Sequence, residues 1–380
     1  MDFSWNEEQL LLRKTVLEFA RKELNRPDNQ GIASDGWRVL WKKCADFGIM
    51  GLPFPKQYGG LETDTLSTAL ALETLGYGFK DAGFLFAVNA QMWSVQMPIW
   101  RHGNEQQKQF YLPRLLAGEW IGGHAMSEPS SGSDAFAMET TATRCGEEYV
   151  IRGSKTFVTN APHANLFLVF ALTDRNTGWM GISGFLVDRD SPGLTVGTKI
   201  AKMGLSSAPM AEVFFDDCHV SLSARLGKEG QGARIFSDSM EWERTLILAS
   251  QVGAMERQLE ETVNYAQQRM QSHRPIGKFQ AVSHRIAEMK LRLETARLLL
   301  YRAAWAKEKG HSTFSESALA KVHISEAAVQ NALDAIQMHG GYGYTSEGGV
   351  EVALRDAIGG RIYSGTSEVL RNVIAHDLGL

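Results

Sequence analysis

The feature that most constrains the fold is an apolar pattern that changes twice along the chain. From Asn6 to about Gly118, apolar residues recur near the helical period, with charged residues between them. From about Gly122 to Leu226 the pattern shifts to short β-rich runs bounded by Gly, Pro, Asn or Asp. From Gln231 onward the helical pattern returns in longer segments. The predicted order is therefore helical, β, helical, which is an α+β fold.

The first part predicts short helices joined by turns. Asp64–Gly78 begins with a residue suited to an N-cap and ends with a glycine, and Asn104–Glu119 is amphipathic. The sequence FPKQYGG at Phe54–Gly60 predicts a turn between helices.

The middle part predicts short strands, and their spacing indicates a compact antiparallel barrel or sandwich. The β-rich runs are 147–161, 164–174, 181–190, 194–200 and 211–220. The last part predicts three long helices, at 233–269, 281–310 and 313–341, with apolar stripes broad enough to form a bundle. The expected domains are 1–120, helical; 121–227, β; and 228–380, a helical bundle.

Composition excludes several classes of protein. The 380 residues carry a net charge of −4, which gives no electrostatic reason to expect nucleic acid or an anionic membrane as partner. No run of about 18 apolar residues exists, and the N-terminus is too charged for a signal peptide. Cys44, Cys145 and Cys218 are widely spaced and form no metal-binding pattern, so no metal is expected. A reducing cytoplasm is the expected location.

Glu243 is unusual within the first long helical segment. Phe236 and Met240 precede it by seven and three residues, and Leu246 and Ile247 follow it by three and four. These spacings place an acid on an apolar helix face, where an unpaired carboxylate is costly. Helix geometry alone favours an interhelical salt bridge, for example with an arginine of the second long helix, over a catalytic base.

Glu241, by contrast, has Ser237, Asp238, Arg244 and Thr245 as its helical neighbours, which predicts a solvated face.

Two glycine-rich stretches can let backbone N–H groups approach a phosphate or a ring. They are EPSSGSD at Glu128–Asp134 and HGGYGY at His339–Tyr344, and each alone is more often an ordinary turn. The sequence GTSEV at Gly365–Val369 equally predicts a helix start, with Thr366 or Ser367 as N-cap.

Together these stretches resemble the acyl-CoA dehydrogenase superfamily over essentially the whole chain. The matching segments, in order, are 125–135, 153–161, 213–220, 265–289, 337–344, 355–357 and 363–369. The resemblance implies an N-terminal helical domain, a middle β domain, a C-terminal four-helix bundle, bound FAD and a homotetramer.

The resemblance also implies a set of cofactor residues. Phe157 stands where many members have a tryptophan beside the isoalloxazine, and Arg269 and Gln280 match residues that reach the FAD of a neighbouring subunit. One departure follows Arg269, because the family's RxxFG reads RMQSH here and Ser272 replaces the phenylalanine. The full implied set is Met126, Ser127, Gly132, Ser133, Phe157, Thr159, Arg269, Gln280, Gln337, Gly341, Thr366 and Glu368.

In most members the catalytic base is a glutamate at the position of Ser364. In isovaleryl and long-chain members the base comes instead from the long helix, directly before an arginine. That residue is Glu243 here, followed by Arg244. The resemblance therefore implies Glu243 as the base. It also implies that the backbone N–H of Ser364 donates a hydrogen bond to the substrate carbonyl. The implied substrate contacts are Ser133, Arg244, Ser364 and Gly365.

A narrower resemblance is to dehydrogenases and oxidases that act on L-proline held as a thioester on a peptidyl carrier protein. It rests on segments that include 225–244 and 362–375. The implied partners are a carrier protein and an electron acceptor, either a transfer flavoprotein or O2. The alternatives are an acyl-CoA dehydrogenase of the isovaleryl type, a flavin monooxygenase of the same fold, or a helical scaffold without flavin.

Overall fold

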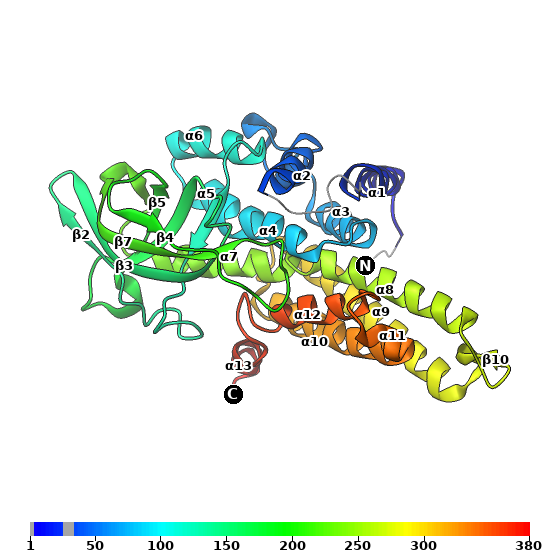
Figure 1. Ribbon diagram of the computed structural model, residues 1–380. Coiled ribbons are helices and arrows are strands. Elements are labelled where there is room, and N and C mark those ends of the chain that lie inside the picture. The colour runs from blue at the N-terminus through cyan, green and yellow to red at the C-terminus, as the bar shows by residue number, and fades with distance from the viewer. Residues whose placement is uncertain (1–3, 26–33) are drawn as a thin grey trace.

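The computed structural model describes residues 4–25 and 34–380. Helices, then a sheet, then helices follow one another along the chain, and Figure 1 shows the sheet at one end of the molecule and the bundle extending away from it. The predicted α+β order is therefore confirmed. Of the expected first domain, residues 1–3 and 26–33 lie outside the described part.

The N-terminal helices begin where side chains satisfy their free N–H groups. The Asp64 carboxylate accepts from the Ser67 N–H at 2.7 Å, and Asn104 forms a capping box with Gln107. A π-helical turn, η5 (Met92–Gln96), connects two of these helices. The helices are α1 (Glu7–Phe19), α2 (Ser34–Asp46), α3 (Thr65–Gly78), α4 (Ala82–Gln91), α5 (Met97–His102) and α6 (Glu105–Leu116).

The middle sheet has the strand order β6-β7-β3-β2-β4-β5-β8, with β1 beside β4. The pairings of β1 and of β2 with β4 are parallel, so the sheet is mixed and not wholly antiparallel as predicted. The strands are β1 (Gly122–Ala125), β2 (Thr141–Cys145), β3 (Glu148–Thr159), β4 (Leu166–Leu172), β5 (Ile182–Asp188), β6 (Leu194–Val196), β7 (Met210–Ser221) and β8 (Arg225–Leu226).

Strand β4 shows how the sheet separates two cores. Leu166, Leu168 and Phe170 join a core that extends through the N-terminal helices and the bundle. The intervening Phe167 and Val169 join a second core on the other face of the sheet. This alternation follows from the two-residue period of a strand, and it anchors the sheet to the helices on one face.

The C-terminal part is a bundle whose helices α8, α9 and α10 pack on one another. Its elements are α7 (Gly232–Leu246), α8 (Ala249–Gln268), β9 (Met270–Gln271), β10 (Arg274–Pro275), α9 (Gln280–Glu308), α10 (Phe314–His339), α11 (Gly341–Tyr344), α12 (Val350–Gly360) and α13 (Ser367–Asp377). The helices expected over 281–310 and 313–341 are α9 and α10. No helix within the described part is long and apolar enough to cross a bilayer.

The prediction of one helix over 233–269 is wrong, because the chain breaks at Ile247 and Leu248 between α7 and α8. The Thr245 hydroxyl donates to the Glu241 carbonyl at 2.8 Å, one turn back. Such back-bonding bends helices, and the β-branched Thr245 and Ile247 add crowding at the same place. The break lies one turn after Glu243.

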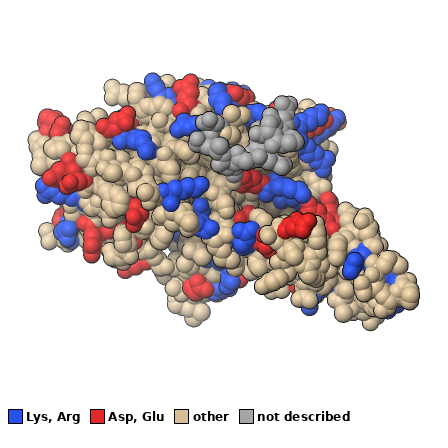
Figure 2. Space-filling model, viewed as in Figure 1, with Lys and Arg blue, Asp and Glu red and all other residues tan. Residues whose placement is uncertain are grey.

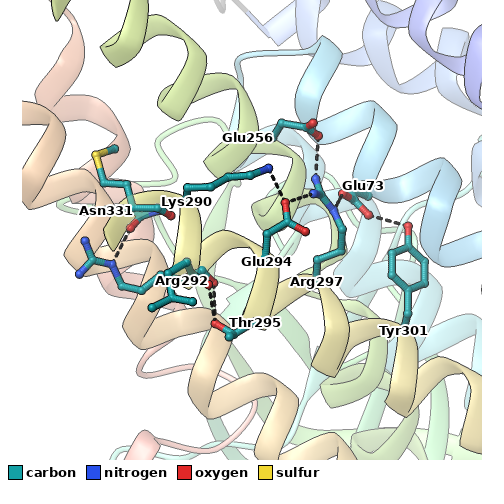
Figure 3. A network of polar contacts seen from close by, with 11 residues as sticks. Glu73, Glu256, Lys290, Arg292, Glu294, Thr295, Arg297, Tyr301 and Asn331 are labelled. Carbon is teal, nitrogen blue, oxygen red and sulfur yellow. Dashed lines mark hydrogen bonds and ion pairs between the residues drawn. The ribbon is translucent and has the colours of Figure 1, made fainter. Parts of the chain in front are cut away.

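An ionic network around the buried Glu73 joins α3 of the N-terminal part to the bundle (Figure 3). Arg297 of α9 donates to Glu73 of α3 at 2.7 Å, to Glu256 of α8 at 2.8 Å and to Glu294 at 3.0 Å. The Tyr301 hydroxyl donates to the second Glu73 oxygen at 2.5 Å. Burial raises the pKa of Glu73, and the nearby Arg297 opposes that rise. The carboxylate is therefore tolerated in this place because of its partners.

On the face that Figure 2 shows, lysine and arginine are interspersed with aspartate and glutamate over the helices and the sheet. This mixture agrees with the small net charge of −4.

We expect Arg297→Met to lower the free energy of unfolding by about 3–5 kcal/mol, because it leaves the Glu73 carboxylate buried without its cation. The matched control is Arg302→Met on the same helix, where the arginine side chain is 55% exposed and lies 3.8 Å from Glu316. Its expected cost is about 0–1 kcal/mol. Urea denaturation of both variants measures the difference, and equal losses would show that the network does not hold the two parts together.

Candidate active site

Glu243 lies on the buried face of α7, with 6% of its surface exposed. Met240, Leu246 and Ile247 are buried on the same face, and Phe236 is partly buried two turns before. The apolar surroundings that the sequence predicted are therefore present.

Two neutral hydroxyl groups hold the Glu243 carboxylate, one on each oxygen. Ser94 of η5 donates to Oε2, and Ser364 donates to Oε1. Within residues 4–25 and 34–380 the carboxylate forms no ion pair within 4.0 Å, so the structure contains no interhelical salt bridge of the kind that helix geometry favoured.

Burial raises the pKa of Glu243, and the two serine hydroxyls and the charge of Arg244 oppose the rise. A carboxyl group with a raised pKa is a stronger base once it has lost its proton, and it is suited to proton transfer near neutral pH.

The Ser364–Gly365 turn lies directly beside this carboxylate and has an unusual backbone. Ser364 has φ +57° and Gly365 has φ +92°, both in the left-handed region. The positive φ of Gly365 favours glycine by conformation, because other residues adopt it only with strain.

Two basic side chains, the half-buried Arg244 and the fully buried Lys321, hold the carbonyl groups of this turn. Arg244 Nε donates to the Ser364 carbonyl at 3.0 Å, and Lys321 Nζ donates to the Gly365 carbonyl at 2.6 Å. Lys321 has no exposed surface, and burial together with the nearby Arg244 lowers its pKa to about 7. The Ser364 N–H forms no hydrogen bond within the described part of the chain.

The prediction of a solvated face for Glu241 is wrong. Its carboxylate accepts from the Thr313 N–H at 2.8 Å and lies 2.9 Å from Lys307 Nζ, and its side chain is 20% exposed. The ends of α9 and α10 cover that face of α7, and a helical period alone does not indicate such packing.

The segment at Met126 and Ser127 lies beside β3. Lys155 Nζ donates to the Met126 carbonyl at 2.9 Å and pairs with Glu128 at 2.8 Å, and all three are buried. The Thr156 N–H donates to the Ser127 carbonyl at 2.8 Å. A buried ion pair thus fixes this segment against the strand.

Phe157 has the backbone strain that often marks a functional site. Its φ is +56°, it lies in an irregular stretch of β3 between Lys155 and Val158, and 62% of its surface is exposed. A bulky residue in the left-handed region is rare and costs energy. The strain presents a flat apolar ring outward from the sheet, two residues before Thr159.

The other predicted cofactor residues fall into two groups. Gly132 and Ser133 are exposed after Ser127, and Thr366 and Glu368 lie at the start of α13, where Thr366 is the N-cap. Exposed Arg269, Gln280, Gln337 and Gly341 lie at the ends of α8, α9 and α10, near the far end of the bundle from the sheet (Figure 1). Tyr265 stacks on His339 at 4.3 Å, which joins the ends of α8 and α10.

Three residues beside the predicted site had no sequence signal that singled them out. Ser94 is 149 positions from Glu243, and Lys321 occupies an ordinary helical position. His124 of β1 lies between Phe170 and Phe236, burial lowers its pKa to about 4, and its Nε2 has no partner among the described residues.

The three parts of the chain match family models that describe the acyl-CoA dehydrogenase N-terminal domain at residues 6–119, the middle domain at 123–218 and the C-terminal domain at 230–379. The chain belongs to the acyl-CoA dehydrogenase family.

Individual relatives show which members of the family the chain resembles. The chain is 42% identical over 381 residues to an L-prolyl peptidyl-carrier-protein dehydrogenase of Pseudomonas fluorescens, with all of both chains covered. It is 46% identical to the solved structure of the prolyl acyl carrier protein oxidase AnaB, with a TM-score of 0.97 over 99% of this chain and 100% of that one. It is 40% identical to PigA solved with FAD and proline, with a TM-score of 0.96 and full coverage of both.

We expect Ser364→Ala to move the acidic limb of the pH profile of kcat/KM to higher pH. The active form is the Glu243 carboxylate, so activity rises as pH passes through its pKa. Loss of a hydroxyl that stabilises the charge raises that pKa further. Ser239→Ala is the control, because the Ser239 hydroxyl donates to the Phe236 carbonyl at 2.8 Å on the same helix. If the acidic limb of the Ser364→Ala profile stays at the wild-type pH, the Ser364 hydroxyl does not stabilise the Glu243 carboxylate.

Proposed function

We propose that this protein is an FAD-dependent dehydrogenase or oxidase of L-proline carried as a thioester on a peptidyl carrier protein. The observation that carries the proposal is the buried Glu243 carboxylate, held by two hydroxyls beside the strained Ser364–Gly365 turn. The similarity to prolyl-carrier enzymes over the full chain supports this substrate class.

Glu243 would remove the proton from the carbon next to the thioester carbonyl. The negative charge that then develops on the carbonyl oxygen needs a donor, and the Ser364 N–H would supply it. Arg244 and Lys321 hold both carbonyls of the turn, so they would keep that N–H directed at the substrate. Most members of the family carry a glutamate at the position of Ser364. The serine keeps the backbone donor of that position, and the base comes instead from α7.

The residues present fit a flavin. The exposed, strained ring of Phe157 offers a flat apolar surface for an isoalloxazine, next to the segment at Met126 and Ser127. When bound there, FAD would accept the hydride that leaves the substrate at a position adjacent to the α-carbon. Ser133, Thr159, Thr366 and Glu368 would complete this side of the cofactor site, with Ser133 also on the substrate side.

A homotetramer is the assembly that we propose. Arg269, Gln280, Gln337 and Gly341 belong to helix ends near the end of the bundle far from the sheet, and Phe157 belongs to β3 of the sheet, so one FAD would contact both groups only through a second subunit (Figure 1). Exposed Leu291, Leu298 and Leu333 on α9 and α10 offer apolar surface for such contacts.

The remaining partners are a carrier protein and an electron acceptor, either a transfer flavoprotein or O2. We also propose the division into domains at 1–120, 121–227 and 228–380, and a cytoplasmic location in keeping with three free cysteines. The presence of Glu243 disfavours a monooxygenase, which often lacks a base of this kind.

We expect Glu243→Gln to retain FAD and bind the prolyl thioester but to lose about 10²–10⁴-fold in flavin reduction rate, because the amide keeps the shape and cannot take the proton. Anaerobic stopped-flow absorbance measures the rate. Glu241→Gln is the control on the same helix, and it should affect thermal stability more than rate, because that acid pairs with Lys307.

The wild-type protein is assayed in parallel with prolyl-carrier protein, free proline and isovaleryl-CoA. Turnover of isovaleryl-CoA alone would replace the proposed substrate with a branched-chain acyl-CoA. Normal flavin reduction by Glu243→Gln would remove Glu243 as the base.

The cross-subunit site gives a separate expectation. Arg269→Ala should lose FAD during gel filtration, with the flavin-to-protein absorbance ratio falling several-fold, because a cationic contact to the pyrophosphate is removed. Arg302→Ala, on an exposed surface of α9, is the control. A monomeric protein that retains FAD with undiminished affinity would refute the shared site.

A further inference from the structure

Ser94 has hydrogen-bonding capacity that its contact with the Glu243 carboxylate does not use. It lies in η5, a π-helical turn (Met92–Gln96) whose five residues are all buried. Single π-helical turns inside helical segments are uncommon and are frequent at functional sites. Here the turn directs a hydroxyl at Oε2 of Glu243.

The Ser94 hydroxyl has unused capacity to accept a hydrogen bond. A serine hydroxyl carries one donor hydrogen and two acceptor lone pairs, and its hydrogen is directed at Glu243. No donor within the described residues is hydrogen-bonded to the Ser94 oxygen. The free lone pairs therefore lie in a buried place beside the carboxylate.

The two serines define two sides of the base. Ser364 contacts Oε1 and belongs to the turn whose N–H would hold the thioester carbonyl. Ser94 contacts Oε2, so it lies on the side away from that turn. With the α-carbon at the carboxylate and the carbonyl at Ser364, a substituent of the α-carbon on the Oε2 side would approach Ser94.

Charge favours the same orientation. Arg244 holds the Ser364 carbonyl, so the Ser364 side carries the arginine charge near the base, and protonated Lys321 adds to it. A prolyl ring nitrogen bears N–H donors and often a positive charge, and it is disfavoured beside these cations. The prolyl nitrogen is therefore favoured on the opposite side of the carboxylate, where the Ser94 oxygen can accept a hydrogen bond from it.

We propose that Ser94 is a specificity-determining residue that accepts a hydrogen bond from the ring N–H of the prolyl group. This inference rests on the proposed function and deepens it, because it explains the selection of an α-amino acyl thioester over an alkyl acyl thioester of the same shape. A carbocyclic acyl group has no donor for Ser94, and its binding would leave the hydroxyl oxygen unpaired.

The test compares Ser94→Ala with Ser364→Ala, which removes the matching hydroxyl from the other oxygen of Glu243. Each flavin-loaded variant is assayed with prolyl thioester on its carrier protein for kcat and KM. The inhibition constant of a cyclopentanecarbonyl thioester on the same carrier is then measured against that substrate. The ring size and the carrier are the same, and only the nitrogen differs.

Ser94→Ala is expected to raise the KM of the prolyl thioester by about tenfold, while the inhibition constant of the carbocyclic thioester changes by less than about twofold. Ser364→Ala is expected to change the KM of the prolyl thioester and the inhibition constant of the carbocyclic thioester by similar factors. Ser94→Cys keeps a side chain of similar size but has a weaker acceptor, so it should weaken binding of the prolyl thioester as Ser94→Ala does. Flavin content and melting temperature confirm that each variant is folded.

A lower prolyl kcat with an unchanged KM, or equal changes in the prolyl KM and the carbocyclic inhibition constant, would overturn the inference, because Ser94 would then act only through Glu243 or would not distinguish the ring nitrogen. That result leaves the proposed function intact if the wild-type protein oxidises the prolyl thioester. A wild-type protein that does not oxidise it overturns both.

Discussion

The arrangement of the site depends on a carboxylate that is buried without a counter-ion. Glu243 has only neutral hydroxyl donors, Ser94 and Ser364, on its two oxygens. An ion pair would lower the pKa and make the acid a poor base, whereas a wholly apolar site would keep it protonated. Two hydroxyls give an intermediate environment, and each of them must be brought to α7 by a different part of the chain.

The nearby cations are used elsewhere, on the backbone of the Ser364–Gly365 turn. Arg244 and Lys321 bond to its two carbonyls, and the Ser364 N–H has no partner in the described chain. The same turn therefore offers a hydroxyl to the base and a backbone donor to a substrate oxygen. The positive φ of Ser364 is the backbone cost of presenting the two groups together, whereas Gly365 adopts its positive φ without strain.

The order of the three parts and the burial of Glu243 could be predicted from the sequence, because both depend on local apolar periodicity. The surroundings of Glu241 could not, since Lys307 and Thr313 reach it from other helices. Ser94 and Lys321 were missed for the same reason, because their roles arise from contacts distant in sequence. The break after α7 was missed because no Pro or Gly marks it, and the site roles of the cofactor residues rest on the family resemblance.

The most direct measurement of the central claim follows the α-hydrogen of the substrate. With the flavin held reduced so that oxidation cannot proceed, prolyl thioester is incubated with the protein in D2O and its mass is recorded. If Glu243 is the base, the wild-type protein exchanges the α-hydrogen for deuterium and Glu243→Gln does not, while Ser364→Ala does so more slowly at low pH. Exchange at the wild-type rate in Glu243→Gln would show that another group removes the proton.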